Sequence, residues 1–173
     1  MVLAQIQDSE HDTFAVPQMI DASSLPSETT RPVRILALDF GSRRIGLAVS
    51  DELGVTAQGL PTLLRTNKRS DLDHLRRVIR QYSVGEIVLG LPLRMSGEEG
   101  IQSAKVQEFA EELRRKFKLP VHLFDERLTS VEANRLLRES EMNVRNRPEV
   151  VDQMAAGLIL QAFLEFRKSQ REA

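Results

Sequence analysis

The stretch RILALDFGSRRIGLAVSD, residues 34–51, is the most informative part of the sequence. Residues 35–38 form a short, fully apolar run, which is typical of a strand buried on both faces. Gly41 and Ser42 mark a turn, and residues 45–49 form a second β-prone run. The pattern therefore predicts a hairpin whose first strand lies in the centre of a sheet.

An aspartate, Asp39, stands where this first strand ends. A carboxylate at the end of a core strand loses hydration, and this is costly unless a partner compensates for it. Two interpretations are open at this point. Asp39 is a ligand for a cation, or it caps the turn through its own backbone, as aspartate often does.

The composition narrows the kinds of chemistry available. The chain of 173 residues has no cysteine and three histidines, which excludes a thiol nucleophile, a disulfide framework and a thiolate zinc site. Any metal would be held by carboxylates, which favours magnesium or manganese. No apolar run approaches the roughly 20 residues of a membrane span, and the first thirty residues lack the features of a signal peptide. We therefore expect a cytoplasmic protein with no membrane partner.

The chain divides into three parts by composition. Residues 1–32 mix prolines and polar residues without periodicity, and they contain five acidic residues against one arginine. This composition predicts a disordered or loosely attached extension. Residues 33–168 carry the periodic apolar patterns of a folded domain, and residues 169–173 are expected to be a tail. The net charge of −1 does not indicate nucleic-acid binding, but the domain without its extension is mildly basic.

The order of elements predicts an α/β fold. After the hairpin we expect a strand at 57–64, a helix after Ser70, strands at 86–91 and 121–124 with a helix between them, a short helix through Leu137, and a final helix with Pro148 in its first turn. Strands joined by short turns are antiparallel, whereas strands joined through helices are parallel. The prediction is a mixed five-stranded sheet, with a three-stranded antiparallel meander plus two parallel strands, flanked by helices.

Acidic residues fall where this layout would bring them together. Asp39 ends the first strand, Asp125 and Glu126 end the last, and Asp152 lies on the apolar side of the final helix. Carboxylates gathered in this way suit two divalent ions about 4 Å apart, which activate water for phosphodiester cleavage. The alternative for Asp152 is pairing with an arginine or a place at the edge of the apolar stripe.

The adjacent acids are expected to have different roles. Neighbouring residues that leave a strand point to opposite faces, so both cannot easily reach one metal pair. We favour Glu126 as the ligand because its side chain is longer. Asp125 would support the site by holding Arg127 or a backbone amide in the turn.

Four segments together resemble the YqgF/RuvX family of ribonuclease H-like proteins. They are DFGSRRIGLAVSD at 39–51, GLPLRMSGEEG at 90–100, DERLTS at 125–130 and VDQMAAGLILQAFL at 151–164. The resemblance implies a ribonuclease H-like fold and a metal-dependent nuclease that processes the 5′ end of pre-16S rRNA. It implies catalytic, metal-binding acids at Asp39, Glu126 and Asp152 with Mg²⁺ or Mn²⁺, two ions being expected, and a substrate-facing loop at 90–100.

One departure concerns the strand expected at 86–91. In ribonuclease H relatives this strand supplies an acid, whereas here it ends in Gly90-Leu91-Pro92. The second acid would then have to come from the following strand, which ends at Asp125 and Glu126.

Arginines are the candidate contacts for nucleic acid, since the guanidinium suits bidentate binding of phosphate. The candidates are Arg43, Arg44, Arg94, Arg127, Arg145 and Arg147. For each of them the alternative is simple solvation. One tyrosine and no tryptophan argue against a groove that stacks single strands, so structured RNA such as pre-16S rRNA, or duplex read through its backbone, is the expected partner.

Two other functions stay open at this level. One is a Holliday-junction resolvase acting on branched DNA, which would require a stable homodimer rather than a monomer because it needs two symmetric active sites. The other is a non-catalytic RNA-binding factor in ribosome assembly. Solution mass and single-turnover cleavage assays would separate these functions.

Overall fold

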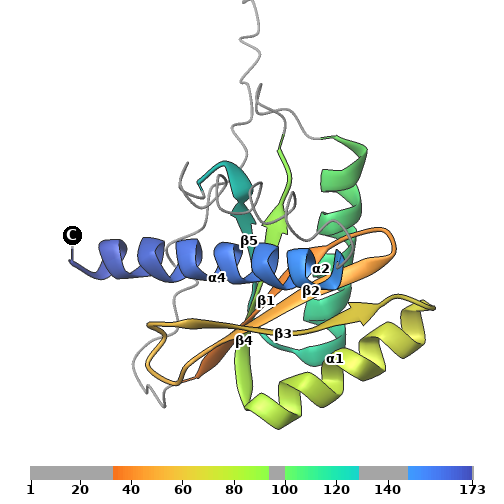
Figure 1. Ribbon diagram of the computed structural model, residues 1–173, viewed down its shortest axis with the longest axis horizontal. Coiled ribbons are helices and arrows are strands. Elements are labelled where there is room, and N and C mark those ends of the chain that lie inside the picture. The colour runs from red at the N-terminus through yellow and green to blue at the C-terminus, as the bar shows by residue number, and fades with distance from the viewer. Residues whose placement is uncertain (1–32, 94–99, 129–147, 173) are drawn as a thin grey trace, which may run out of the picture.

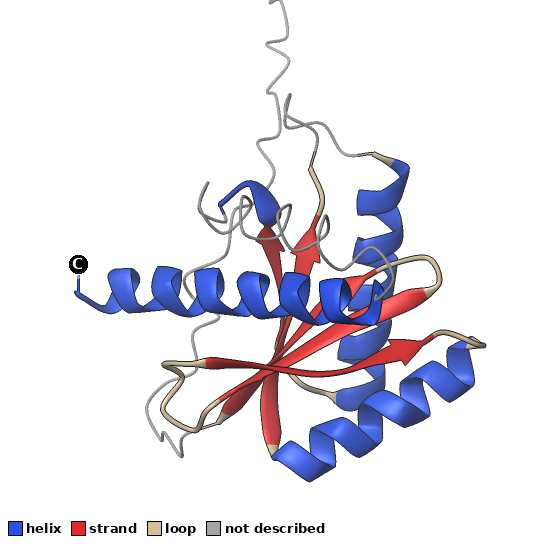
Figure 2. Ribbon diagram, in the orientation of Figure 1, coloured by secondary structure: helices blue, strands red, loops and turns tan. Residues whose placement is uncertain are grey.

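The computed structural model describes residues 33–93, 100–128 and 148–172. Within them, five strands form one sheet in the order β3-β2-β1-β4-β5, and helices cover both of its faces (Figures 1 and 2). The strands are β1 (Arg34–Phe40), β2 (Arg44–Ser50), β3 (Ala57–Leu64), β4 (Val84–Leu91) and β5 (Val121–Asp125). The helices are α1 (Lys68–Tyr82), α2 (Ile101–Phe117), the short 3₁₀ helix η2 (Glu126–Leu128) and α4 (Pro148–Glu172).

The pairing of the strands confirms the predicted topology. β1 pairs antiparallel with β2, and β2 pairs antiparallel with β3, as a meander joined by short turns requires. β4 runs parallel to β1 and β5 runs parallel to β4. β1 lies in the centre of the sheet, as its apolar run predicted. The mixed sheet has the expected ribonuclease H-like arrangement.

Side chains that alternate along the strands divide the core into two layers. One layer, which includes Leu36, Leu38 and Leu89, packs with residues of α1 and α2. The other layer, which includes Ala37 and Val88, packs under α4, the helix that crosses the front of the sheet in Figure 1. We call this second side the α4 face.

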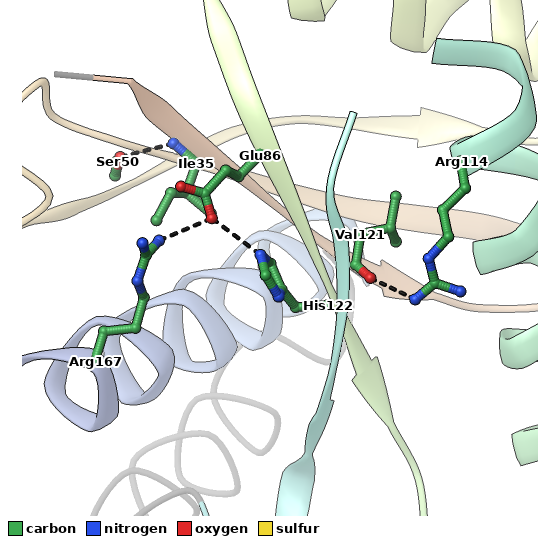
Figure 3. Close-up of polar contacts among 7 residues, drawn as sticks. All are labelled: Ile35, Ser50, Glu86, Arg114, Val121, His122 and Arg167. Carbon is green, nitrogen blue, oxygen red and sulfur yellow. Dashed lines mark hydrogen bonds and ion pairs between the residues drawn. The ribbon is translucent and has the colours of Figure 1, made fainter. Parts of the chain in front are cut away.

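A group of polar and charged side chains joins α4 to the amino end of the parallel strands. Glu86 of β4 lies between His122 of β5 and Arg167 of α4 (Figure 3), and its Oε2 is 2.9 Å from His122 Nε2 and 2.9 Å from Arg167 Nη1. The Arg167 guanidinium also lies over the ring of Phe163, 5.7 Å from its centroid. We call Glu86, His122 and Arg167 the Glu86 cluster.

The ends of the helices correct two details of the sequence prediction. α1 begins at Lys68, before Ser70, because the side chain of Asn67 caps it by accepting a hydrogen bond from the Ser70 N–H at 3.0 Å. The expectation that Ser70 precedes the helix is therefore wrong. Pro148 is the first residue of α4, as predicted, and the helix continues to Glu172, through residues expected to form a tail.

Several predictions fall outside the described residues: the short helix through Leu137, and the positions of Arg94, Arg145 and Arg147. Among the helices that are described, none is long and apolar enough to cross a membrane.

Candidate active site at the carboxyl edge of the sheet

Asp39 lies on the α4 face near the carboxyl end of β1. It follows Ile35 and Ala37 in the alternation of the strand, and both of those residues pack under α4. Its partner across β2 is Gly46, where a Cβ atom would lie 2.1 Å from the carbonyl oxygen of Asp152. Only a glycine permits this approach, which brings the second turn of α4 next to Asp39.

Glu126 reaches the same region from η2, directly after β5. A Cβ atom at Gly90 would lie 2.5 Å from Glu126 Oε1 and 2.6 Å from Ile159 Cδ1. The Glu126 side chain therefore lies over β4 in the space that Gly90 leaves, between β5 and β1. This explains why the strand β4 has a glycine, and no acid, at this position.

The pKa values show that these acids interact. Burial and the nearby charge of Asp152 raise the pKa of Asp39 to about 6. Burial, followed by the charges of Asp39 and Asp125, raises the pKa of Glu126 to about 7. Asp39 is thus electrostatically coupled to both Asp152 and Glu126, and the fold gathers three carboxylates on one face of the sheet.

Asp152 pairs with an arginine. Its Oδ2 is 2.5 Å from Nε of Arg44, the first residue of β2, and both side chains are partly buried, with 21% and 33% of their surface exposed. Arg44 precedes Gly46 by two residues, so it lies on the α4 face as well. Of the alternatives for Asp152 left open by the sequence, pairing with an arginine is present in the structure.

The Asp125 side chain binds Arg127, two residues further along the chain. Its Oδ1 accepts a hydrogen bond from the Arg127 N–H at 2.9 Å, and its Oδ2 is 2.6 Å from Arg127 Nη2. Burial alone would raise the pKa of Asp125, but the hydrogen bonds from Arg127 lower it below the ordinary value. Asp125 therefore fixes Arg127 beside the acids, in the supporting arrangement expected from the sequence.

A family model described as RuvX, Holliday junction resolvase, matches residues 33–166. The chain belongs to the RuvX family.

Two curated RuvX relatives are close in sequence. A Koribacter versatilis protein is 65% identical over 139 residues, spanning 80% of this chain and 91% of its own length. A Moorella thermoacetica protein is 49% identical over 133 residues, spanning 77% of this chain and 95% of its own. Both are provisionally named pre-16S rRNA nucleases.

The solved structures are more distant. The yeast mitochondrial Holliday junction resolvase Ydc2 is 11% identical, with a TM-score of 0.49, over 84% of this chain and 83% of its own. The assignment to the RuvX family rests on the sequence matches.

The acids of this RuvX chain have the donor chemistry of a divalent-cation site, since carboxylate oxygens suit magnesium and manganese. In the part of the chain that is described, however, no three acidic or histidine side chains stand in the geometry of a metal centre. The Asp152 carboxylate instead contacts Arg44.

The remaining predicted contact for nucleic acid, Arg43, is exposed in the turn between β1 and β2. Its carbonyl oxygen accepts a hydrogen bond from the Arg65 N–H at 2.9 Å, which ties this turn to the end of β3. Arg43 is thus held close to the acids by its backbone while its side chain faces solvent.

Sequence reasoning missed the role of Arg65, which holds this turn through several contacts. Arg65 donates to the carbonyl oxygen of Gly41 at 2.8 Å, pairs with the buried Asp71 at 3.3 Å, and lies 4.4 Å from the ring centroid of Phe40. These contacts of Arg65 fix the backbone that follows Asp39. An acid in the first turn of a helix is common, so Asp71 gave no signal of this long-range role.

Proposed function

We propose that this chain is a nuclease that hydrolyses phosphodiester bonds with the help of divalent metal ions. The observation that carries the proposal is the gathering of Asp39, Glu126 and Asp152 on one sheet face, with the pKa values of Asp39 and Glu126 raised to about 6 and about 7. Such a cluster is stabilised when a cation binds it, because the cation offsets the mutual repulsion of the carboxylates. Membership of the RuvX family supports the same function.

In this proposal Asp39, Glu126 and Asp152 hold Mg²⁺ or Mn²⁺, two ions in all. When bound, such ions activate water and stabilise the leaving oxygen of a phosphodiester. The chain's own part is placement: Gly90 lets Glu126 extend toward Asp39, and Gly46 lets α4 bring Asp152 to the same edge. Burial of these acids strengthens their attraction for a cation.

The proposed substrate is structured RNA, with the 5′ end of pre-16S rRNA as the specific target. The names of the Koribacter and Moorella relatives support this choice. Arg127, fixed by Asp125, and the exposed Arg43 would contact phosphates next to the acids. Arg94, Arg145 and Arg147 are proposed as further contacts from the sequence.

The test is cleavage of precursor RNA with and without Mn²⁺, comparing the wild-type protein with Asp39→Asn. We expect metal-dependent cleavage by the wild type and none by the variant. Equal cleavage by both proteins would overturn the assignment of Asp39. RNA binding without cleavage under single-turnover conditions would favour the non-catalytic assembly factor.

A second candidate function is resolution of Holliday junctions, which the description of the matched family favours. Two symmetric cuts require two active sites, and so a stable homodimer. Solution mass, together with cleavage of a synthetic four-way junction, separates this function from RNA processing. A monomer that cleaves RNA and leaves the junction intact would exclude it.

A further inference from the structure

We propose that Arg44 is a positioning residue that competes with the metal ion for Asp152. In the metal-free protein its guanidinium neutralises the Asp152 carboxylate. When a divalent ion binds the acids, Arg44 is released and contacts a phosphate of the substrate. The inference rests on the proposed metal-dependent function and deepens it, because it names the residue that links metal loading to substrate binding.

The first step of the argument is the contact itself. Arg44 Nε lies 2.5 Å from Asp152 Oδ2, and the pair is partly buried between β2 and α4. The backbone around it is fixed on both sides. The carbonyl oxygen of Arg44 accepts from the Gly41 N–H at 2.9 Å, and Gly46 contacts the backbone of Asp152. The pair is therefore set by the fold, unlike a contact between two mobile surface chains.

The second step is the conflict of charge. Asp39 has no ion-pair partner among the described residues, and the charge of Asp152 contributes to its raised pKa. A divalent ion shared by Asp39 and Asp152 would lie next to the Arg44 guanidinium, where like charges repel strongly at partial burial. Asp152 can serve the ion or Arg44, but the two cations compete for it.

The third step is the unused capacity of the guanidinium. The contact with Asp152 uses Nε, while the two Nη groups have no hydrogen bond to any other described residue. A guanidinium has five N–H donors and suits bidentate binding of phosphate. Arg127 differs, since its Nε and Nη2 both bond to Asp125. A metal ion that binds Asp152 would therefore break the ion pair of Arg44, whereas the pair of Arg127 with Asp125 would stay.

The test is the affinity for Mn²⁺ measured by calorimetry on the full chain without nucleic acid. Arg44→Gln should bind Mn²⁺ roughly fivefold more tightly than the wild type, because a partly buried ion pair is worth about 1 kcal/mol. Arg43→Gln is the matched control, since it removes the same charge from the adjacent exposed position. Its affinity should change less than about twofold. Arg44→Lys keeps a competing cation and should bind close to the wild-type value.

A second measurement uses the wild type alone and does not depend on the folding of a variant. The Nε–H resonance of Arg44, assigned by its loss in Arg44→Lys, should shift when Mg²⁺ is added, as the pair with Asp152 breaks. The Nε–H resonance of Arg127 should shift far less, because Asp125 keeps it.

The outcomes separate the two proposals. Equal Mn²⁺ affinity in Arg44→Gln and Arg43→Gln, or weaker binding in Arg44→Gln, overturns the competition and leaves the metal-dependent function standing. An Arg44 resonance that does not move while Mg²⁺ binds has the same meaning. If neither the wild type nor any variant binds Mn²⁺, the proposed metal site fails and the competition fails with it.

Discussion

The pKa values of buried carboxylates shift in opposite directions at the two ends of the α4 face. At the amino end, burial alone would raise the pKa of Glu86, but hydrogen bonds from His122 and Arg167 lower it below its ordinary value. At the carboxyl end, burial and neighbouring acids raise the pKa values of Asp39 and Glu126. The first arrangement stabilises the fold, whereas the second lowers its stability unless a cation binds.

The difference supports the proposal that the acids at the carboxyl end, and not the Glu86 cluster, form the functional site. A fold that can surround Glu86 with two partners could do the same for Asp39, yet it places Asp152 and Glu126 there instead. Unfavourable electrostatics retained in one place are typical of functional sites. The predictions below test this contrast.

Asp39→Asn should show the largest effect, on cleavage. We expect metal-dependent activity to fall by more than about 100-fold, because losing even the outer partners of a metal site costs about 10–100-fold. The folded protein should be at least as stable as the wild type, since the amide removes a charge that burial disfavours. Cleavage rates and urea unfolding measure the two quantities. A variant that unfolds would show that Asp39 is structural.

Gly90→Ala should weaken metal binding by about tenfold while the protein stays folded. The new methyl group would meet Glu126 Oε1 and Ile159 Cδ1, both at the ends of flexible side chains that can move aside. Moving Glu126 removes one acid from the cluster, an effect comparable to loss of an outer partner. Mn²⁺ calorimetry gives the affinity.

Gly59→Ala is the control for this substitution. It adds the same methyl group to the exposed edge strand β3, where the nearest atom, Gln153 Cβ, is 3.4 Å away. Its metal affinity should match the wild type. If both glycine variants bind Mn²⁺ equally well, Glu126 is not a ligand.

Glu86→Gln should reduce the stability of the fold and leave metal binding unchanged. This tests the contrast at the amino end of the α4 face, where the Glu86 cluster lies. The amide keeps an acceptor oxygen but has no charge, so Arg167 is left half-buried without a counter-charge, at a cost of about 2 kcal/mol. The melting temperature should fall by roughly 5 °C. Glu111→Gln breaks an exposed pair with Arg114 and should cost less than about 0.5 kcal/mol.

The pH dependence of stability should differ at the two ends. Asp39 and Glu126 have raised pKa values when folded, so the unfolded chain ionises first, and metal-free stability falls as the pH rises from about 4 to about 7. Glu86 has a lowered pKa, so its contribution is present above its unfolded value and is lost as the pH falls. The stability of Asp39→Asn relative to the wild type should therefore increase by about 2 kcal/mol between pH 4 and pH 7.

Urea unfolding at several pH values, with metal removed by a chelator, measures this difference. Saturating Mg²⁺ should reverse this trend, because the bound cation stabilises the ionised acids of the wild type while Asp39→Asn binds it weakly. A constant difference between the two proteins across this range would contradict the raised pKa of Asp39.

The sequence predicted the sheet well because its signals are local. The apolar run at 35–38 and the turn at Gly41 and Ser42 fixed the central hairpin, and the helices between later strands required parallel pairing. The start of α1 was missed by a few residues because Asn67 and Ser70 are both good capping residues, and only the hydrogen bond distinguishes them.

The candidate site was predicted only in part. The sequence predicted Asp39 and Glu126 as ligands from their places at strand ends, and Asp152 from its place on the apolar side of the final helix. It could not show that Arg44 pairs with Asp152, because 108 positions separate them and each residue had several alternatives of equal merit. Gly90 also gave no signal, since its role depends on a side chain from the neighbouring strand.

The space above Gly90 has a consequence for how such sites diverge. An acidic side chain on β4 at this position would occupy the volume that Glu126 fills, so the acid can come from β4 or from the end of β5, but not from both. A lineage that moved the acid from one strand to the other would pass through an intermediate with an overfilled or an empty position. The two placements are therefore alternatives separated by at least two substitutions, and Gly90 is compatible only with the acid at the end of β5.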